Sequence, residues 1–97
     1  MTAIIWSPQS LRDIESIRDF IAQDSPAYAE LETRRIISAV ERLQRFPQSG
    51  RAVPERGVSS IREVVASPYR IVYRLRGDIV EIATVCRASR LFPNDVR

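Results

Sequence analysis

Three arginines in the second half of this 97-residue chain have the type and spacing to bind a negatively charged partner. Arg70 lies in the stretch SPYRIVYRLR, and Arg87 and Arg90 lie in VCRASR. None has an acidic residue close to it in sequence, so forked hydrogen bonds to phosphates or carboxylates are open to all three. We predict a target-binding or anion-binding surface at these positions. The alternative is that they are solvated charges on a strand face.

The same three arginines are poorly suited to catalysis. Cleavage of RNA without a metal needs one group that removes the 2′-hydroxyl proton and another that protonates the leaving oxygen. Arginine stays protonated at neutral pH and cannot act as that base. The neighbours that could titrate are Glu63, Tyr69 and Tyr73, and strand alternation turns both tyrosines toward the core. We therefore predict no catalytic residues; if the protein is a ribonuclease, the three arginines are the candidates.

Composition excludes several kinds of site. The chain has no histidine and a single cysteine, Cys86. Its sequence therefore contains no histidine–cysteine pattern typical of a metal site, and it cannot form an internal disulfide. All 15 basic residues are arginine, and the formal net charge is +3. Residues 1–50 carry 6 arginines and 7 acids (6 − 7 = −1), whereas residues 51–97 carry 9 and 5 (9 − 5 = +4). The positive C-terminal half favours an acidic partner, and no metal or cofactor is predicted.

The first half of the chain predicts a strand followed by two helices. Residues 2–6, TAIIW, are β-prone, and the pairs Ser7–Pro8 and Ser25–Pro26 are helix start signals. The second helix is predicted to run to about Phe46, because Pro47 prevents it from continuing. A turn this tight makes the two helices an antiparallel hairpin. Apolar residues recur at helical spacing in both segments; they are Leu11, Ile14, Ile17 and Ile21, then Leu31, Ile36, Ala39, Val40 and Leu43.

The second half predicts a sheet. Residues 47–60 hold two prolines and two glycines without periodicity, which indicates a loop. Three runs rich in β-branched and aromatic residues follow, namely IREVVA, YRIVYRLR and IVEIATVC. With the first strand and the helices they predict an α+β fold, in which an antiparallel helix hairpin packs on a small antiparallel β-sheet. The length suits a single domain over residues 1–97.

A two-residue turn at Gly77–Asp78 predicts the register of the last two strands, because such a loop fixes which residues face each other. The pairs on one face are almost wholly apolar and should pack on the helices; they are Leu75/Val80, Tyr73/Ile82, Ile71/Thr84 and Tyr69/Cys86. The pairs on the other face carry arginines; they are Arg76/Ile79, Arg74/Glu81, Val72/Ala83 and Arg70/Val85.

The second of these faces is predicted to be an exposed arginine face, on which Arg87 continues beside Arg70. Arg74 and Glu81 face each other there, and such a cross-strand ion pair contributes about 0.2–1 kcal/mol to stability, so we interpret it as structural. Cys86 falls on the apolar face and is expected to be a small buried side chain and not a nucleophile.

Several stretches resemble the RelE/ParE superfamily of bacterial type II toxins. In chain order they are SPQSLRDIESIRDFIAQDSP, ISAVERLQRFPQSGR, IREVVASPYRIVYRL and VCRASR, and together they cover nearly the whole chain. The resemblance implies a helix hairpin on a small antiparallel sheet and a cognate antitoxin that wraps around the toxin. It also implies one of two activities. RelE-like members cleave mRNA on the ribosome, and ParE-like members inhibit DNA gyrase.

Departures from the RelE-like pattern favour the ParE-like branch. RelE-like members typically carry lysines on the strand before the YR pair, where this chain has Ile61 and Glu63. A carboxylate there would repel an anionic substrate. Arg70 matches the arginine of the YR pair, but Phe92 follows Arg90 where the ribonucleases have a tyrosine. Both branches often have a histidine three residues before the terminal arginine, and Arg87 stands there instead.

The sequence therefore predicts a bacterial type II toxin resembling ParE, which binds DNA gyrase, arrests growth and serves plasmid stabilisation. A ParD-like antitoxin is the predicted partner in a hetero-oligomer, bound in a groove where the helix hairpin meets the sheet. A RelE-like ribosome-dependent mRNA endonuclease is the second hypothesis, and a non-toxic module that only binds an antitoxin is the third. No apolar run approaches the roughly 20 residues of a membrane span and no secretory signal is visible, so a cytoplasmic protein is expected.

Overall fold

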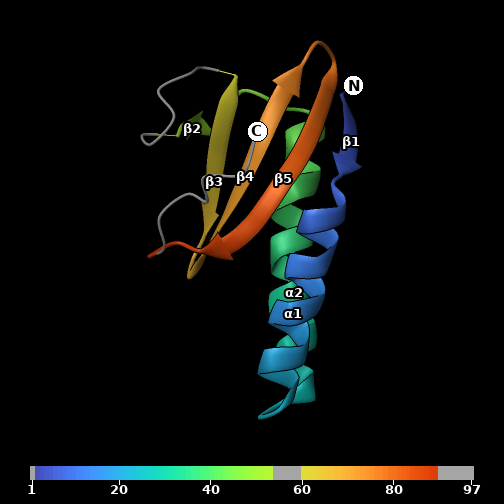
Figure 1. Cartoon of the computed structure of the whole chain (residues 1–97), viewed down its shortest axis with the longest axis vertical. Helices are drawn as coiled ribbons and strands as arrows, with labels where there is room; N and C mark the ends of the chain where they lie inside the picture. The colour runs from blue at the N-terminus through green and yellow to red at the C-terminus, as the bar shows by residue number, and fades with distance from the viewer. Residues whose placement is uncertain (1, 54–59, 90–97) are drawn as a thin grey trace.

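The computed structural model describes residues 2–53 and 60–89, in which two helices pack on one face of a five-stranded sheet (Figure 1). The helices are Pro8–Ala22 (α1) and Pro26–Glu41 (α2), followed by a short 3₁₀ turn, Arg42–Gln44 (η1). The strands are Ala3–Trp6 (β1), Arg51–Ala52 (β2), Ile61–Ala66 (β3), Tyr69–Arg76 (β4) and Ile79–Arg87 (β5). The α+β class and the helix hairpin are confirmed.

Both helices begin at the predicted serine–proline pairs. The hydroxyl oxygen of Ser7 accepts a hydrogen bond from the backbone N–H of Ser10 at 3.1 Å, and that of Ser25 accepts one from Tyr28 at 3.1 Å. These caps satisfy N–H groups that have no partner within the first helical turn. α2 ends before the predicted Phe46, because the chain tightens into η1 on its way to Pro47.

The sheet has the strand order β1-β5-β4-β3-β2, and β1 runs parallel to β5 while the other neighbours are antiparallel. The predicted antiparallel meander of β3, β4 and β5 is confirmed, and the parallel β1 makes the whole sheet mixed. A parallel pair needs a long crossover connection, and the helices and strands between β1 and β5 supply it. β2, only two residues long, lies within the segment predicted as loop.

The predicted register of β4 and β5 holds near the turn and fails beyond a β-bulge. Arg76 pairs with Ile79 and Arg74 with Glu81, as predicted. Past Val72/Tyr73, one extra residue in β5, Ala83, shifts every later pair by one position. Arg70 consequently pairs with Cys86 and not with Val85.

The bulge lies where β1 has ended and α1 covers the edge of β5. Ser7 donates its hydroxyl to the carbonyl oxygen of Ala83 at 2.9 Å. The carboxylate of Asp13 accepts hydrogen bonds from the hydroxyl of Thr84 at 2.6 Å and from the N–H of Val85 at 3.0 Å. Side chains of α1 and its cap therefore take over the backbone groups of β5 that no strand pairs.

The main core lies between the helices and the β-sheet. Its buried members come from α2, η1 and the three long strands; they are Ile36, Ala39, Val40, Leu43, Ala66, Tyr69, Ile71, Tyr73, Val80, Ile82 and Val85. Four of the five residues predicted for the buried side of the second helix are among them. Leu31 is not, because its side chain is 59% exposed; Figure 1 shows the helix hairpin projecting past the end of the sheet.

Tyr73 ties this core to the loop that follows η1. Its hydroxyl donates to the carbonyl oxygen of Pro47 at 2.8 Å and accepts from the N–H of Gly50 at 3.0 Å. Gly50 fits tightly, since a Cβ there would lie 2.6 Å from both the Tyr73 hydroxyl oxygen and the Glu63 carbonyl oxygen. Burial raises the pKa of the Tyr73 phenol above its usual value, although the hydrogen bond from Gly50 opposes the shift.

Replacing Tyr73 with phenylalanine is expected to lower the free energy of unfolding by about 1–3 kcal/mol, because the buried N–H of Gly50 and the half-buried carbonyl group of Pro47 lose their partner. The raised pKa means that the neutral phenol stabilises the fold. This contribution is complete below about pH 10 and is lost as the pH rises through the folded-state pKa. Denaturant titrations at increasing alkaline pH should therefore show a steeper loss for the wild type than for Tyr73→Phe. Parallel curves would contradict the assignment.

Candidate functional site

Arg70 is buried in an ion pair with Glu63. The two residues are 5% and 2% exposed, and Arg70 Nη2 lies 2.5 Å from Glu63 Oε1. The other carboxylate oxygen of Glu63 accepts a hydrogen bond from Arg51 Nε at 2.6 Å. One carboxylate is thus held between two guanidinium groups, and the prediction that Arg70 lies on an exposed face is wrong.

The register of three strands explains this cluster. Arg70 pairs with Val65, so Glu63, two residues earlier in β3, is its diagonal neighbour on the same face of the sheet. β2 places Arg51 directly opposite Glu63. Val53, Ile61 and Val72 form a small apolar cluster on this face, away from the helices. The buried charges of Arg70 and Glu63 are removed from water and need ionic partners, and each of the two residues provides one for the other.

Arg87 does not join Arg70. The bulge makes Arg87 the partner of Tyr69 and Cys86 the partner of Arg70, so Arg87 and Arg70 lie on opposite faces. Arg87 is exposed, and Cys86 is half-buried on the Arg70 side, which corrects the prediction that Cys86 lies on the core face. Arg90 lies outside the described residues.

The predicted ion pair between Arg74 and Glu81 is present. Arg74 Nη1 lies 3.3 Å from Glu81 Oε1, and Arg76 approaches the same oxygen at 3.9 Å. The Glu81 carboxylate thus lies close to both Arg74 and Arg76, and it partly neutralises the positive charge on this face of the sheet. The pair has no feature that points to binding or catalysis.

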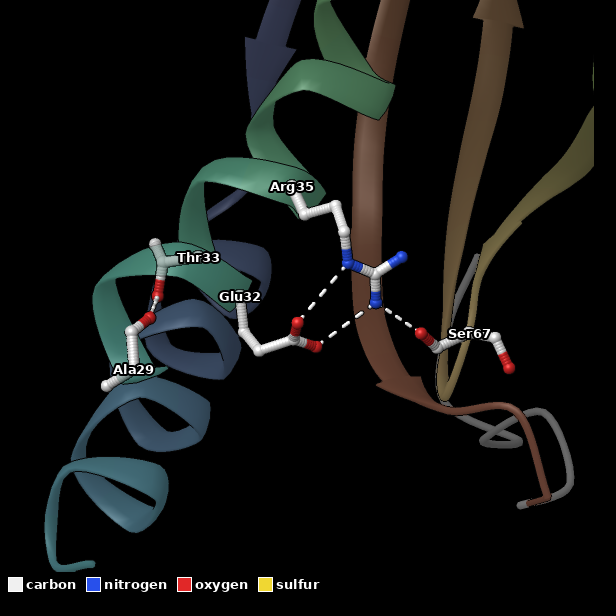
Figure 2. Close-up of polar contacts among 5 residues, drawn as sticks. All are labelled: Ala29, Glu32, Thr33, Arg35 and Ser67. Carbon is white, nitrogen blue, oxygen red and sulfur yellow. Dashed lines mark hydrogen bonds and ion pairs between the residues drawn. The ribbon is translucent and has the colours of Figure 1, made fainter. Parts of the chain in front are cut away.

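A second buried carboxylate, which the sequence interpretation missed, joins α2 to the sheet. Glu32 is buried and receives two hydrogen bonds from Arg35, at 3.3 and 3.1 Å (Figure 2). Arg35 also donates to the carbonyl oxygen of Ser67 in the turn between β3 and β4. The hydrogen bond that Arg35 donates to Glu32 raises the pKa of Arg35. The spacing of Glu32 and Arg35 along the helix was the available signal.

A groove of about 590 Å³ opens between the end of α2 and the edge of the sheet. Phe46 and Val65 are 60% and 51% exposed, and both line it. Arg42 and Arg51 add positive charge to its lining, and Glu63 adds one negative charge. The groove therefore combines exposed apolar side chains with arginines, and it lies at the junction of helix hairpin and sheet where a partner groove was predicted.

No three histidine, cysteine, aspartate or glutamate side chains in residues 2–53 and 60–89 gather closely enough to hold a metal ion. In the same part of the chain, neither helix has the length and apolar character needed to cross a membrane.

Comparison with known proteins identifies the family. The chain is 34% identical over 92 residues to toxin RelE2 of Caulobacter vibrioides, and the match covers 94% of this chain and 100% of that protein. Its fold matches a solved chain of the chromosomal ParDE toxin–antitoxin system of P. aeruginosa (TM-score 0.73, 22% identity, 90% and 96% of the two chains). It also matches the YoeB dimer of Staphylococcus aureus (TM-score 0.62, 15% identity, 92% and 98%). The profile described as ParE toxin of type II toxin-antitoxin system, parDE, matches residues 4–92, and the chain belongs to this family.

Proposed function

We propose that this toxin acts as ParE-like members do, by binding DNA gyrase, and that it does not cleave RNA. The observation that carries the proposal is the buried ion pair of Arg70 and Glu63. A ribonuclease of this fold would need Arg70 to steady the phosphate that is cleaved. Here the guanidinium is almost inaccessible, and its charge is balanced by a carboxylate that would repel the substrate.

The target contact is proposed to lie at Arg87 and Arg90. Arg87 is exposed at the end of β5, where its guanidinium can make charge-assisted hydrogen bonds to a carboxylate or phosphate of the target. Arg70 belongs to the proposal only indirectly, because it holds β4 against β3 through Glu63. Gyrase acts on DNA, so the proposal places the toxin in the bacterial cytoplasm.

The deciding experiment compares the two activities with one purified protein. The chain is expected to inhibit gyrase supercoiling and to accumulate cleaved DNA, while mRNA on programmed ribosomes stays intact. Codon-specific cuts in ribosome-bound mRNA would overturn the proposal in favour of the ribonuclease. That second candidate is retained because a relative at 34% identity bears the name toxin RelE2. If expression without an antitoxin arrests neither growth nor translation, the chain is a non-toxic module.

Replacing Arg87 with alanine is expected to weaken gyrase inhibition in a graded way. Loss of one charge-assisted contact should raise the concentration for half-inhibition roughly 10- to 150-fold. Arg87→Lys should rescue only part of the effect, because the forked geometry is lost. Arg76→Ala is the matched control, since Arg76 is an exposed arginine at the far end of the same hairpin. Equal effects at the two sites would contradict a specific contact at Arg87.

The antitoxin is proposed to occupy the groove between α2 and β3. An acidic amphipathic segment suits it, because Phe46 and Val65 offer apolar surface and the arginines of the lining offer opposite charge. Such binding would make the toxin and its ParD-like antitoxin a hetero-oligomer. Copurification from the native operon tests this, and a chain that purifies alone and arrests nothing would count against it.

A further inference from the structure

The outer edge of the sheet is only partly paired beside this groove. β2 covers two positions of β3, Arg62 and Glu63, and ends there. β3 continues to Ala66 and remains paired with β4 on its other side. The last part of β3 is therefore an edge strand, and an edge strand presents backbone groups to which another chain can pair.

Val65 is the residue whose backbone faces this open edge. The N–H of Leu75 donates to Ser60 on the β4 side at 2.8 Å, and the N–H of Val53 donates to Ile61 on the β2 side at 3.1 Å. Because hydrogen-bonding direction alternates along an antiparallel strand, residues 61, 63 and 65 all point their N–H and C=O groups toward β2. Within residues 2–53 and 60–89, nothing hydrogen-bonds to the N–H or C=O of Val65.

The chain itself turns away from the place opposite Val65. A longer β2 would put Ser49 there, since Arg51 pairs with Glu63 and the strands are antiparallel. Instead the N–H of Ser49 donates to the carbonyl oxygen of Phe46 at 3.0 Å, in the turn that follows η1. The groove of about 590 Å³ lies at this position, and Ser49, Phe46 and Val65 all line it.

We infer that an extended, acidic segment of the antitoxin adds to the sheet along β3 and hydrogen-bonds to the backbone of Val65, continuing the line of β2. The inference rests on the proposed antitoxin groove and specifies how the groove is filled, by a strand and not by a helix. Arg42 and Arg51 lie on the lining, and the acidic lining residue Glu63 is shared between Arg51 and Arg70, so one carboxylate faces three guanidinium groups. An acidic partner is favoured by this excess of positive charge.

Strand alternation also fixes which side chains of the partner meet which wall. The residue paired with Val65 would share a face with Arg51, so an aspartate or glutamate there could pair with its guanidinium. Its two neighbours in the partner would point to the other face, toward Val64 and Phe46, where apolar side chains are suited. The expected pattern in the antitoxin is therefore an acidic residue flanked by apolar ones.

Val65→Pro tests strand addition while sparing the sheet. Proline lacks the outward N–H but leaves the β3–β4 ladder complete, because residue 65 does not donate to β4. The probe is the protein encoded beside this chain in its operon, and the measurement is its dissociation constant by calorimetry. We expect binding about tenfold to a hundredfold weaker for Val65→Pro and a clearly smaller loss for Val65→Ala, which keeps the N–H and removes only part of the apolar surface. Phe46→Ala should weaken binding, whereas Phe20→Ala, equally exposed on α1, should not.

Hydrogen exchange on the wild-type complex gives a second readout that needs no variant. The Val65 amide should exchange rapidly in the free toxin and become protected when the antitoxin binds. Unchanged Val65 exchange, or equal affinity for Val65→Pro and Val65→Ala with a native circular dichroism spectrum, would overturn the inference. A free chain that dimerises with Val65 protected would assign the edge to a second copy and overturn it as well. Gyrase inhibition by Val65→Pro without antitoxin should equal wild type, so the inference and the proposed function can fail separately.

Discussion

Replacing Ile71 with alanine is expected to lower the free energy of unfolding by about 2–5 kcal/mol. Ile71 has no exposed surface and lies in the middle of β4, within the cluster formed with α2 and β5. Truncation removes apolar contacts and leaves a cavity that a packed sheet cannot easily close. Denaturant unfolding followed by circular dichroism measures the loss.

Arg76→Ala is the matched control on the same strand. Its side chain is 62% exposed and only approaches Glu81, so the expected change is within about 0.5 kcal/mol. Equal losses for the two variants would mean that β4 presents its faces the other way round, and the register of the β4–β5 hairpin would have to be revised.

Replacing Arg70 with alanine is expected to lower the free energy of unfolding by about 3–5 kcal/mol, as breaking a buried ion pair typically does. The variant leaves the buried carboxylate of Glu63 with Arg51 as its only described ionic partner, and the Arg51 side chain is largely exposed. Arg74→Ala provides the comparison, because its ion pair with Glu81 is more accessible and worth less. Similar losses for Arg70→Ala and Arg74→Ala would contradict a buried structural pair.

A double variant separates the structural role of Arg70 from a catalytic one. Glu63→Leu combined with Arg70→Met replaces the ion pair by apolar side chains and is expected to recover most of the lost stability. If Arg70 only supports the fold, growth arrest should return with stability, in cells that produce comparable amounts of folded protein. A stable double variant that arrests nothing would instead indicate that Arg70 acts directly on the target.

The sequence was sufficient for the order of elements and for much of the core. Ser7–Pro8 and Ser25–Pro26 carry local start signals that tertiary structure did not override. Gly77, with a φ of 58°, occupies a conformation that glycine adopts without strain, and the register that follows from the turn is correct for the pairs next to it. These features depend on neighbours in the sequence, which is why they could be predicted.

The failures arise where the fold depends on distant partners. No glycine marks the bulge at Ala83 in the sequence. The bulge forms where Ser7 and Asp13, more than 70 residues earlier in the chain, hydrogen-bond to the edge of β5. That one extra residue reversed the predicted faces of Cys86 and Arg87. The partner of Arg70 was also missed, because Glu63 lies on the neighbouring strand β3 and meets Arg70 only when the two strands pair. From the sequence, Glu63 was considered as a group that could titrate and as a departure from a ribonuclease pattern, but not as an ionic partner of Arg70.

The pairing of β1 with β5 also has a consequence for the order in which the molecule can assemble on the ribosome. Among the described strands β5 is the last to be synthesised, yet it lies between β1 and β4 in the sheet, and Ala3 pairs with Ile79 (79 − 3 = 76 positions later). The helix hairpin can form from local contacts during translation, but the sheet on which it packs stays incomplete until β5 has emerged. A nascent chain of this toxin therefore cannot present its finished surface to any target before Ile79–Arg87 has been synthesised.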